Sequence, residues 1–176
     1  MASTKWVIDS AHSEVNFKVR HLMITNVTGS FKSFSSEVET DGDDLSTAKI
    51  TFSAAIDSIT TGNEQRDGHL KSADFFELEK YPELIFKAEG LKSKGGDEYE
   101  AEGELTLRGV TKKIKLDVES GGIVKDPWGQ TKAGFSVKGK INRKDFGLNW
   151  SAVTEAGGVV VSDEVRINAE VQYIKQ

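Results

Sequence analysis

Apolar and polar residues alternate along most of the chain. The run over residues 14–21 reads Glu-Val-Asn-Phe-Lys-Val-Arg-His, in which every second residue is apolar until the final histidine. The same alternation recurs over residues 50–56, 84–88, 99–107, 114–118, 133–141 and 165–173. Successive side chains of a β-strand point to opposite faces, so this period of two predicts strands with one buried face.

The phase of the alternation slips once, between residues 27 and 38. Apolar residues occupy odd positions up to Phe31 and even positions from Phe34 onward. One extra residue in a strand shifts its side chains in this way. The pattern therefore predicts a β-bulge near Lys32-Ser33.

Seven or eight strands joined by short turns predict an all-β fold, either an antiparallel sandwich or a barrel. The 176 residues fit one domain over 1–176. Only residues 57–81 depart from the strand pattern, and we expect one or two short helices there. Excursions of this length tend to be functional lids or caps.

Composition adds a feature of the inward face. The chain has 17 glycines and 2 prolines. Several small residues share the parity of the apolar ones, namely Ala54, Ala88, Ala101, Gly103, Ala133, Gly139 and Ala169. Inside an eight-stranded barrel, small residues either accommodate its taper or leave a lumen for one small ligand, and the residues alone favour neither.

Several function classes are excluded by composition and charge. Without cysteine the chain has no disulfide, thiol nucleophile or thiolate metal site. A net charge of −5, with basic and acidic residues interspersed, argues against nucleic-acid binding. There is no apolar run long enough for a membrane span and no apolar signal core, so we expect a cytoplasmic protein, or a periplasmic one if a signal was removed.

The three histidines are candidates for catalysis or metal binding. His12 and His21 are an odd number of residues apart and would face opposite sides of one strand, and no pair with His69 has helical ligand spacing. His21 continues the inward face of its strand. It is either a buried, hydrogen-bonded neutral histidine or a polar group that fixes the end of a ligand in an apolar cavity.

The 57–81 excursion combines cations with aromatic residues. Arg66, His69 and Lys71 could meet an anionic head group, or Arg66 and Asp67 could tie the loop to the barrel rim. The aromatic residues Phe75, Phe76 and Tyr81, together with Phe146, Leu148 and Trp150, would plug a barrel end or line a long apolar ligand. There is no nucleophile elbow or phosphate-binding glycine loop, and no strong enzymatic signal.

Motifs spread over nearly the whole chain carry a resemblance. They include Trp6-x-Ile8-Asp9-x-x-His12-Ser13, Val27-x-Gly29-x-Phe31, Ile59-x-Thr61-Gly62, Arg66-Asp67-Gly68-His69-Leu70, Asp74-Phe75-Phe76, Tyr81-Pro82-x-Leu84-x-Phe86, Gly103-x-Leu105-Thr106-Leu107-Arg108-Gly109, Asn142-Arg143-x-Asp145-Phe146, Gly157-Gly158 and Asp163-Glu164-Val165. In this order they resemble the YceI family of bacterial lipocalin-like proteins.

The resemblance implies a lipocalin-like antiparallel eight-stranded barrel whose lumen binds a polyisoprenoid or a related amphiphilic lipid, such as an isoprenoid quinone. Family members are not established enzymes, and no cofactor is implied. Inward parity places on the tunnel Phe17, Val19, His21, Phe52, Phe86, Leu105, Leu107, Phe135 and Ile141. Position on the excursion places at or near an end of the tunnel Arg66, His69, Lys71, Phe75 and Phe76.

Three functions follow as hypotheses. The leading one is non-catalytic carriage or sequestration of a long-chain isoprenoid in the lumen. The second is a lipocalin-type isomerase or hydrolase with His21 as acid/base. The third is a metal-binding protein that uses His12, His21 and His69. Barrel edges could also pair into a homodimer.

Overall fold

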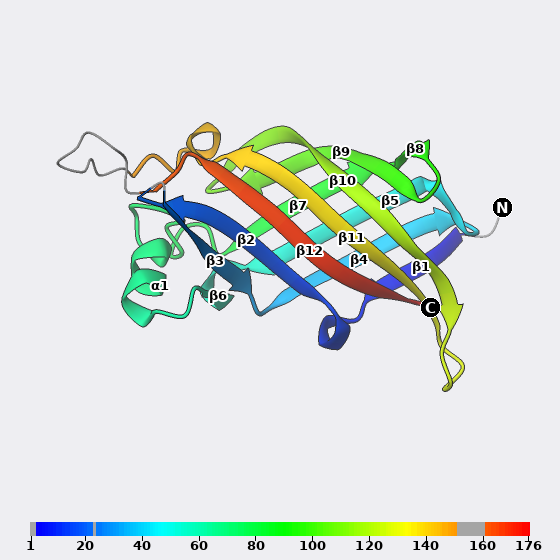
Figure 1. Ribbon diagram of the computed structural model, residues 1–176. Coiled ribbons are helices and arrows are strands. Elements are labelled where there is room, and N and C mark those ends of the chain that lie inside the picture. The colour runs from blue at the N-terminus through cyan, green and yellow to red at the C-terminus, as the bar shows by residue number, and fades with distance from the viewer. Residues whose placement is uncertain (1–2, 23, 151–160) are drawn as a thin grey trace.

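The computed structural model describes residues 3–22, 24–150 and 161–176, and the predicted Gly157-Gly158 motif lies outside them. The described part is mostly strand (Figure 1). The strands are β1 (Ser3–Ile8), β2 (Glu14–His21), β3 (Thr25–Phe31), β4 (Phe34–Asp41), β5 (Asp44–Ala55), β6 (Ile59–Thr60), β7 (Glu83–Glu89), β8 (Lys92–Gly95), β9 (Glu98–Leu107), β10 (Val110–Lys125), β11 (Thr131–Asn142) and β12 (Glu164–Lys175). The helix α1 spans Glu64–Lys71, and short 3₁₀ turns cover Ser10–His12, Ile56–Ser58 and Arg143–Phe146.

The strands close into an antiparallel barrel. In sheet order, β1, β4, β5, β7, β9, β10, β11 and β12 are neighbours, and β12 pairs back onto β1. The same β12 also pairs with β2, which continues to β3 and β6. Since β1 with β2, β3 with β4, and β5 with β6 each form one interrupted strand, the wall has eight strands, as the resemblance implied. Each strand pairs with its neighbours in sequence, which is an up-and-down connection.

The phase slip near Lys32-Ser33 is a strand break, so the predicted β-bulge is wrong. The chain bends there between β3 and β4. The adjacent strands break beside it, at Ser10–His12 and at Ile56–Ser58, and the facing pairs Val15 with Phe31 and Phe31 with Ile59 border these breaks. A backbone hydrogen bond crosses between the strands at the bend, donated by the Lys32 amide to the Ser58 carbonyl at 3.2 Å. Aligned interruptions in three adjacent strands thus shift the apolar pattern in the same way as a β-bulge.

The excursion over residues 57–81 holds one α-helix, within the predicted one or two. Its N-cap is Asn63, whose side-chain oxygen accepts the Arg66 amide at 3.0 Å, and it ends at Lys71 before Ser72. After the helix the chain makes successive turns that bury Phe75. Figure 1 shows α1 across one end of the barrel. Within the described ranges, no helix is long and apolar enough to cross a membrane.

The barrel is packed at the end opposite α1, where β1 begins and β12 ends (Figure 1). Trp6, Ala169, Val171 and Tyr173 are buried in one cluster there. The polar atoms of this cluster have partners, since the Trp6 indole donates to Thr40 at 3.1 Å and the Tyr173 hydroxyl lies 2.8 Å from the Ser36 hydroxyl. Packing with satisfied polar groups closes this end of the lumen.

Candidate functional site

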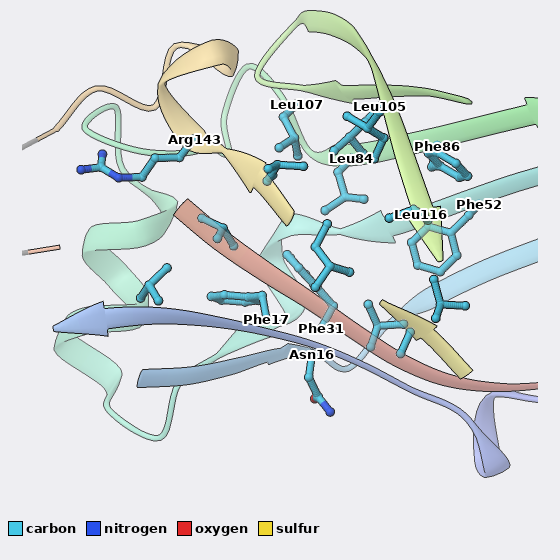
Figure 2. Close-up of a pocket in the computed structure, with 18 of the residues that line it drawn as sticks. Asn16, Phe17, Phe31, Phe52, Leu84, Phe86, Leu105, Leu107, Leu116 and Arg143 are labelled. Atoms are coloured by element: carbon cyan, nitrogen blue, oxygen red, sulfur yellow. The ribbon is translucent and has the colours of Figure 1, made fainter. Parts of the chain in front are cut away.

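The interior toward α1 is hollow. It contains a cavity of about 400 Å³, a size within the range of small-ligand sites (Figure 2). Its wall is formed by side chains from all the long strands, from α1 and from the turns after it, and it is almost entirely apolar. This answers the question that the small inward residues left open, because the lumen is not filled.

Thirteen of the predicted residues line the cavity. They are Phe17, Val19, His21, Phe52, Arg66, His69, Phe75, Phe76, Phe86, Leu105, Leu107, Phe135 and Ile141. Lys71 is not part of the lining; its ammonium group lies 3.3 Å from the Asp57 carboxylate. That these residues contact a ligand stays a prediction.

Other lining residues were not singled out by the sequence analysis. Inward parity alone would have found Val15, Ile114 and Leu116. Two more, Phe31 and Leu84, are buried against the same cavity. Arg143 also lines it, although it lies in a 3₁₀ turn where strand parity gives no signal.

The exposure of the inward residues shows that the cavity is open space. Phe17, Phe52 and Leu116 lie on the inner face of the barrel yet are only partly buried. In a packed interior such side chains are fully buried. Their remaining accessible surface faces the cavity, whereas the Asn16 side chain on the same wall points away from it (Figure 2).

Arg66 ties the start of α1 to the barrel. Its Nε donates to the Thr61 hydroxyl and its Nη2 to the Thr61 carbonyl, both at 2.7 Å. Asp67 completes the contact by accepting from the Thr61 amide at 2.8 Å and from its hydroxyl at 2.6 Å. These bonds favour the structural alternative for Arg66 and Asp67 over binding of an anionic head group.

His69 forms an aromatic cluster at the α1 end of the cavity. Its Nε2 lies 2.8 Å from the Asp74 carboxylate, so its polar edge is occupied. Its ring meets Phe75 and Trp150 edge on, with centroids 5.1 and 5.0 Å apart. Such edge-to-face contacts between rings are favourable. With Arg66 on Thr61 and Lys71 on Asp57, each predicted cation of the excursion has a partner within the protein.

His21 lies at the end of β2, on the edge of the cavity, and is exposed. Of the two alternatives for this position, a buried histidine is therefore wrong. The reason is that β2 reaches the open end of the barrel, where the last inward residue meets solvent. The main chain of His21 forms a β-bridge with Val161.

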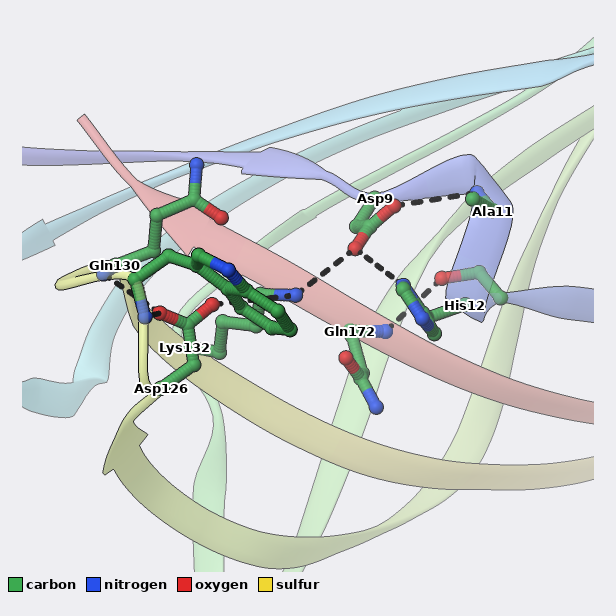
Figure 3. A network of polar contacts seen from close by, with 9 residues as sticks. Asp9, Ala11, His12, Asp126, Gln130, Lys132 and Gln172 are labelled. Carbon is green, nitrogen blue, oxygen red and sulfur yellow. Dashed lines mark hydrogen bonds and ion pairs between the residues drawn. The ribbon is translucent and has the colours of Figure 1, made fainter.

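The structure does not bring His12, His21 and His69 together into one group. Within the described residues, no group of three or more His, Asp or Glu side chains could hold a metal ion. His12 instead belongs to a charged network beside β12 (Figure 3). There the Asp9 carboxylate lies 2.7 Å from His12 and 3.3 Å from Lys132, which also faces Asp126 at 3.7 Å.

This network shifts the acidity of Asp9. Burial raises the pKa of the Asp9 carboxyl. The hydrogen bonds and charges of His12 and Lys132 lower this pKa, and together they outweigh the effect of burial. The pKa therefore lies below its ordinary value, and the carboxylate form is favoured in the folded protein.

Arg143 is a buried charged residue that lines the cavity, with 3% of its side chain exposed. Its guanidinium donates to the carbonyls of Leu148, Trp150 and Ser162 at 2.6, 2.7 and 3.0 Å. Burial lowers the pKa of this guanidinium, and Asp163 at 3.7 Å raises it in part. By holding the main chain at Trp150, Arg143 positions the aromatic cluster over the cavity.

A closed eight-stranded antiparallel barrel with an apolar lumen and a helical segment across one end belongs to the lipocalin-like class of small-molecule-binding barrels. Sequence comparison is more specific. The pattern of the YceI-like domain matches residues 6–173, so the chain belongs to the YceI family.

Individual relatives agree with this assignment. The UPF0312 protein SA2479 of Staphylococcus aureus strain N315 is 38% identical over 171 residues, which covers 97% of each chain. The crystal structure of the Campylobacter jejuni YCEI protein is similar with a TM-score of 0.77 and 37% identity, over 96% of each chain. The polyisoprenoid-binding domain from Saccharophagus degradans has the same fold, with a TM-score of 0.66 and 18% identity, over 97% of this chain and 98% of that one.

Proposed function

We propose that this protein binds a long-chain isoprenoid or a similar amphiphilic lipid in the barrel cavity, and carries or sequesters it without catalysis. The observation that carries the proposal is the apolar cavity, closed by packing around Trp6 and Tyr173 at one end and bordered by polar side chains at the other. The relative from Saccharophagus degradans, a polyisoprenoid-binding domain, supports this ligand class.

Apolar burial is sufficient for tight binding in such a cavity. Each buried CH₂ group contributes about 0.8 kcal/mol, so a chain of several isoprene units gains most of its affinity without polar contacts. Specificity then depends mainly on the shape of the lumen and only weakly on the head group.

The head group would lie at the α1 end, near His69 and Trp150. Since Arg66, His69 and Lys71 already have partners in Thr61, Asp74 and Asp57, this end suits a head group that accepts or donates hydrogen bonds. A quinone or an alcohol fits that requirement better than a strong anion, which would need unpaired cations.

The enzyme hypothesis has less support. General acid/base catalysis by His21 would benefit from a site that excludes water. His21 is exposed at the edge of the barrel. We therefore retain binding as the function.

Gentle purification followed by organic extraction and mass spectrometry tests the proposal. We expect a co-purifying lipid with an isoprenoid chain. Delipidated protein should take up an isoprenoid quinone, measured as quenching of tryptophan fluorescence. A Trp128→Phe variant removes the signal of the exposed tryptophan on the distant β10–β11 hairpin. Protein that is consistently empty and takes up no quinone would refute it.

A further inference from the structure

Three glycines in the barrel strands lie on the inner face. Gly29 faces Phe17 across β2 and β3, Gly103 faces Ala88 and Ile114, and Gly139 faces Ile167. Glycine weakens a strand and often marks a place where another group approaches closely. Each of these positions therefore requires a specific reason.

The reason is a neighbouring side chain that occupies the space of the missing Cβ. A Cβ on Gly29 would lie 2.6 Å from Cε1 of the Phe17 ring, and one on Gly103 would lie 2.8 Å from Cζ of Phe86. A Cβ on Gly139 would overlap the Leu116 Cδ2. These approaches are well inside ordinary van der Waals contact, so each glycine leaves a recess in the wall that a side chain fills.

The three side chains that fill the recesses all line the cavity. Because Phe17, Phe86 and Leu116 fold back over glycine, part of their volume lies within the wall. With any larger residue at the glycine positions, the same side chains would project into the lumen. The recesses thus widen the lumen at three places.

We propose that Gly29, Gly103 and Gly139 set the width of the cavity and thereby allow it to bind methyl-branched chains. An unbranched chain would also fit a narrower lumen. This inference rests on the proposed lipid-binding function and adds residues that determine specificity. A methyl-branched chain has a larger cross-section than an unbranched chain of equal length, so it is the ligand most affected when the lumen narrows.

Gly139 offers the cleanest test. A Cβ there meets the flexible end of Leu116, while the nearest backbone atom, the Lys115 carbonyl oxygen, stays at 3.5 Å. Gly103 is unsuitable because a Cβ would also meet the Lys87 backbone carbonyl. The matched control is Gly134, on the same strand, where an added Cβ has nothing within 4 Å.

The experiment compares the wild type, Gly139→Ala and Gly134→Ala for binding of two alcohols with main chains of equal length. Geranylgeraniol is methyl-branched and hexadecanol is unbranched. We expect Gly139→Ala to weaken geranylgeraniol binding about tenfold and hexadecanol binding less than about twofold, as overpacking by one methyl group predicts. Gly134→Ala should match the wild type, and Leu116→Ala added to Gly139→Ala should restore binding of the branched chain.

Gly29→Ala provides a second variant if Gly139→Ala does not fold, since the three atoms nearest to its added Cβ all belong to the Phe17 ring. Unchanged binding of geranylgeraniol, or equal loss for both alcohols, would overturn the inference. If the wild type binds neither alcohol, the proposed function fails, and crystal structures decide the width question separately. In that case, a crystal structure of Gly139→Ala in which the Leu116 side chain projects into the cavity and reduces its volume supports the inference. A structure in which Leu116 keeps its original position overturns it.

Discussion

Arg143 places a positive charge inside the protein and directs its donors to backbone carbonyls. Leu148 and Trp150 precede Ser162 by more than ten residues in sequence, so one side chain bonds to two separate stretches of main chain. A planar guanidinium spreads five N–H donors over a rigid fork, whereas a lysine ammonium offers three donors from a single nitrogen. This residue is therefore a structural support of the cavity rim.

Arg143→Lys should lower the free energy of unfolding by about 3 kcal/mol, because buried carbonyls lose donors while a charge remains buried. Urea-induced unfolding measures this change. The neighbouring Lys144→Arg, at an exposed position, should stay within about 0.5 kcal/mol of the wild type. Equal stability of the two variants would show that the Arg143 bonds contribute little.

Asp9 makes a prediction about acid stability. Its pKa in the folded protein lies below the ordinary 3.8, so its ionised form contributes stability that is present above the unfolded pKa. That contribution is lost as the pH falls through the lower, folded pKa. Unfolding in urea at a series of acidic pH values should show a steeper loss for the wild type than for Asp9→Asn.

The control for Asp9 is Asp97→Asn at an exposed turn, which should keep the pH dependence of the wild type. If Asp9→Asn and the wild type lose stability in parallel below neutral pH, the ion pairs with His12 and Lys132 do not stabilise the fold.

At the scale of elements, the excursion over residues 57–81 is fastened to the barrel by Arg108. This residue lies in the tight turn between β9 and β10, with a positive φ of 49°. Its guanidinium donates to the Gly147 carbonyl at 2.6 Å and to the Ala73 carbonyl at 2.8 Å. It also pairs with Glu77 at 3.4 Å. The turns after α1 and the turn after β11 are thereby joined over the cavity.

Arg108→Ala should loosen this cover. We expect faster amide hydrogen exchange over residues 72–78, because those turns lose their link to Gly147, and faster release of bound lipid. Exchange measured by mass spectrometry reports the first effect, and stopped-flow fluorescence the second. The control Lys112→Ala, on the exposed face of β10, should change neither. Unaltered exchange in Arg108→Ala would show that the Arg108 bonds do not hold these turns in place.

Prediction of the elements from sequence succeeded where the signal is local. The alternation over 133–141 and 165–173 falls within β11 and β12, since both strands have one inward face along their whole length. It failed at Lys32-Ser33, because a bulge and a bend shift the side-chain phase equally. Only the pairing of β3 with β6 and of β4 with β5 distinguishes the two.

For the whole molecule, the proposed ligand should act as a stabiliser. A lipid that binds only the folded barrel raises the free energy of unfolding by about 2.7 kcal/mol at a free concentration of 100 times its Kd. Thermal unfolding of delipidated protein at rising geranylgeraniol concentrations should therefore show a progressive increase in Tm. Butanol, which buries few CH₂ groups, should have little effect at the same concentrations. A Tm independent of geranylgeraniol would contradict binding in the lumen.

Local patterns in the chain were enough to predict the strands, nine cavity-lining residues by their inward parity, and the resemblance to the YceI family. These depend on residues close together in the chain, where a period of two or a short motif is sufficient. The tertiary structure decided that the lumen is hollow and that Arg66, His69 and Lys71 have partners in Thr61, Asp74 and Asp57. It also decided the buried position of Arg143 and the recess over Gly139. Each of these depends on side-chain packing and partner geometry in the folded barrel, which neither a period of two nor a short motif specifies.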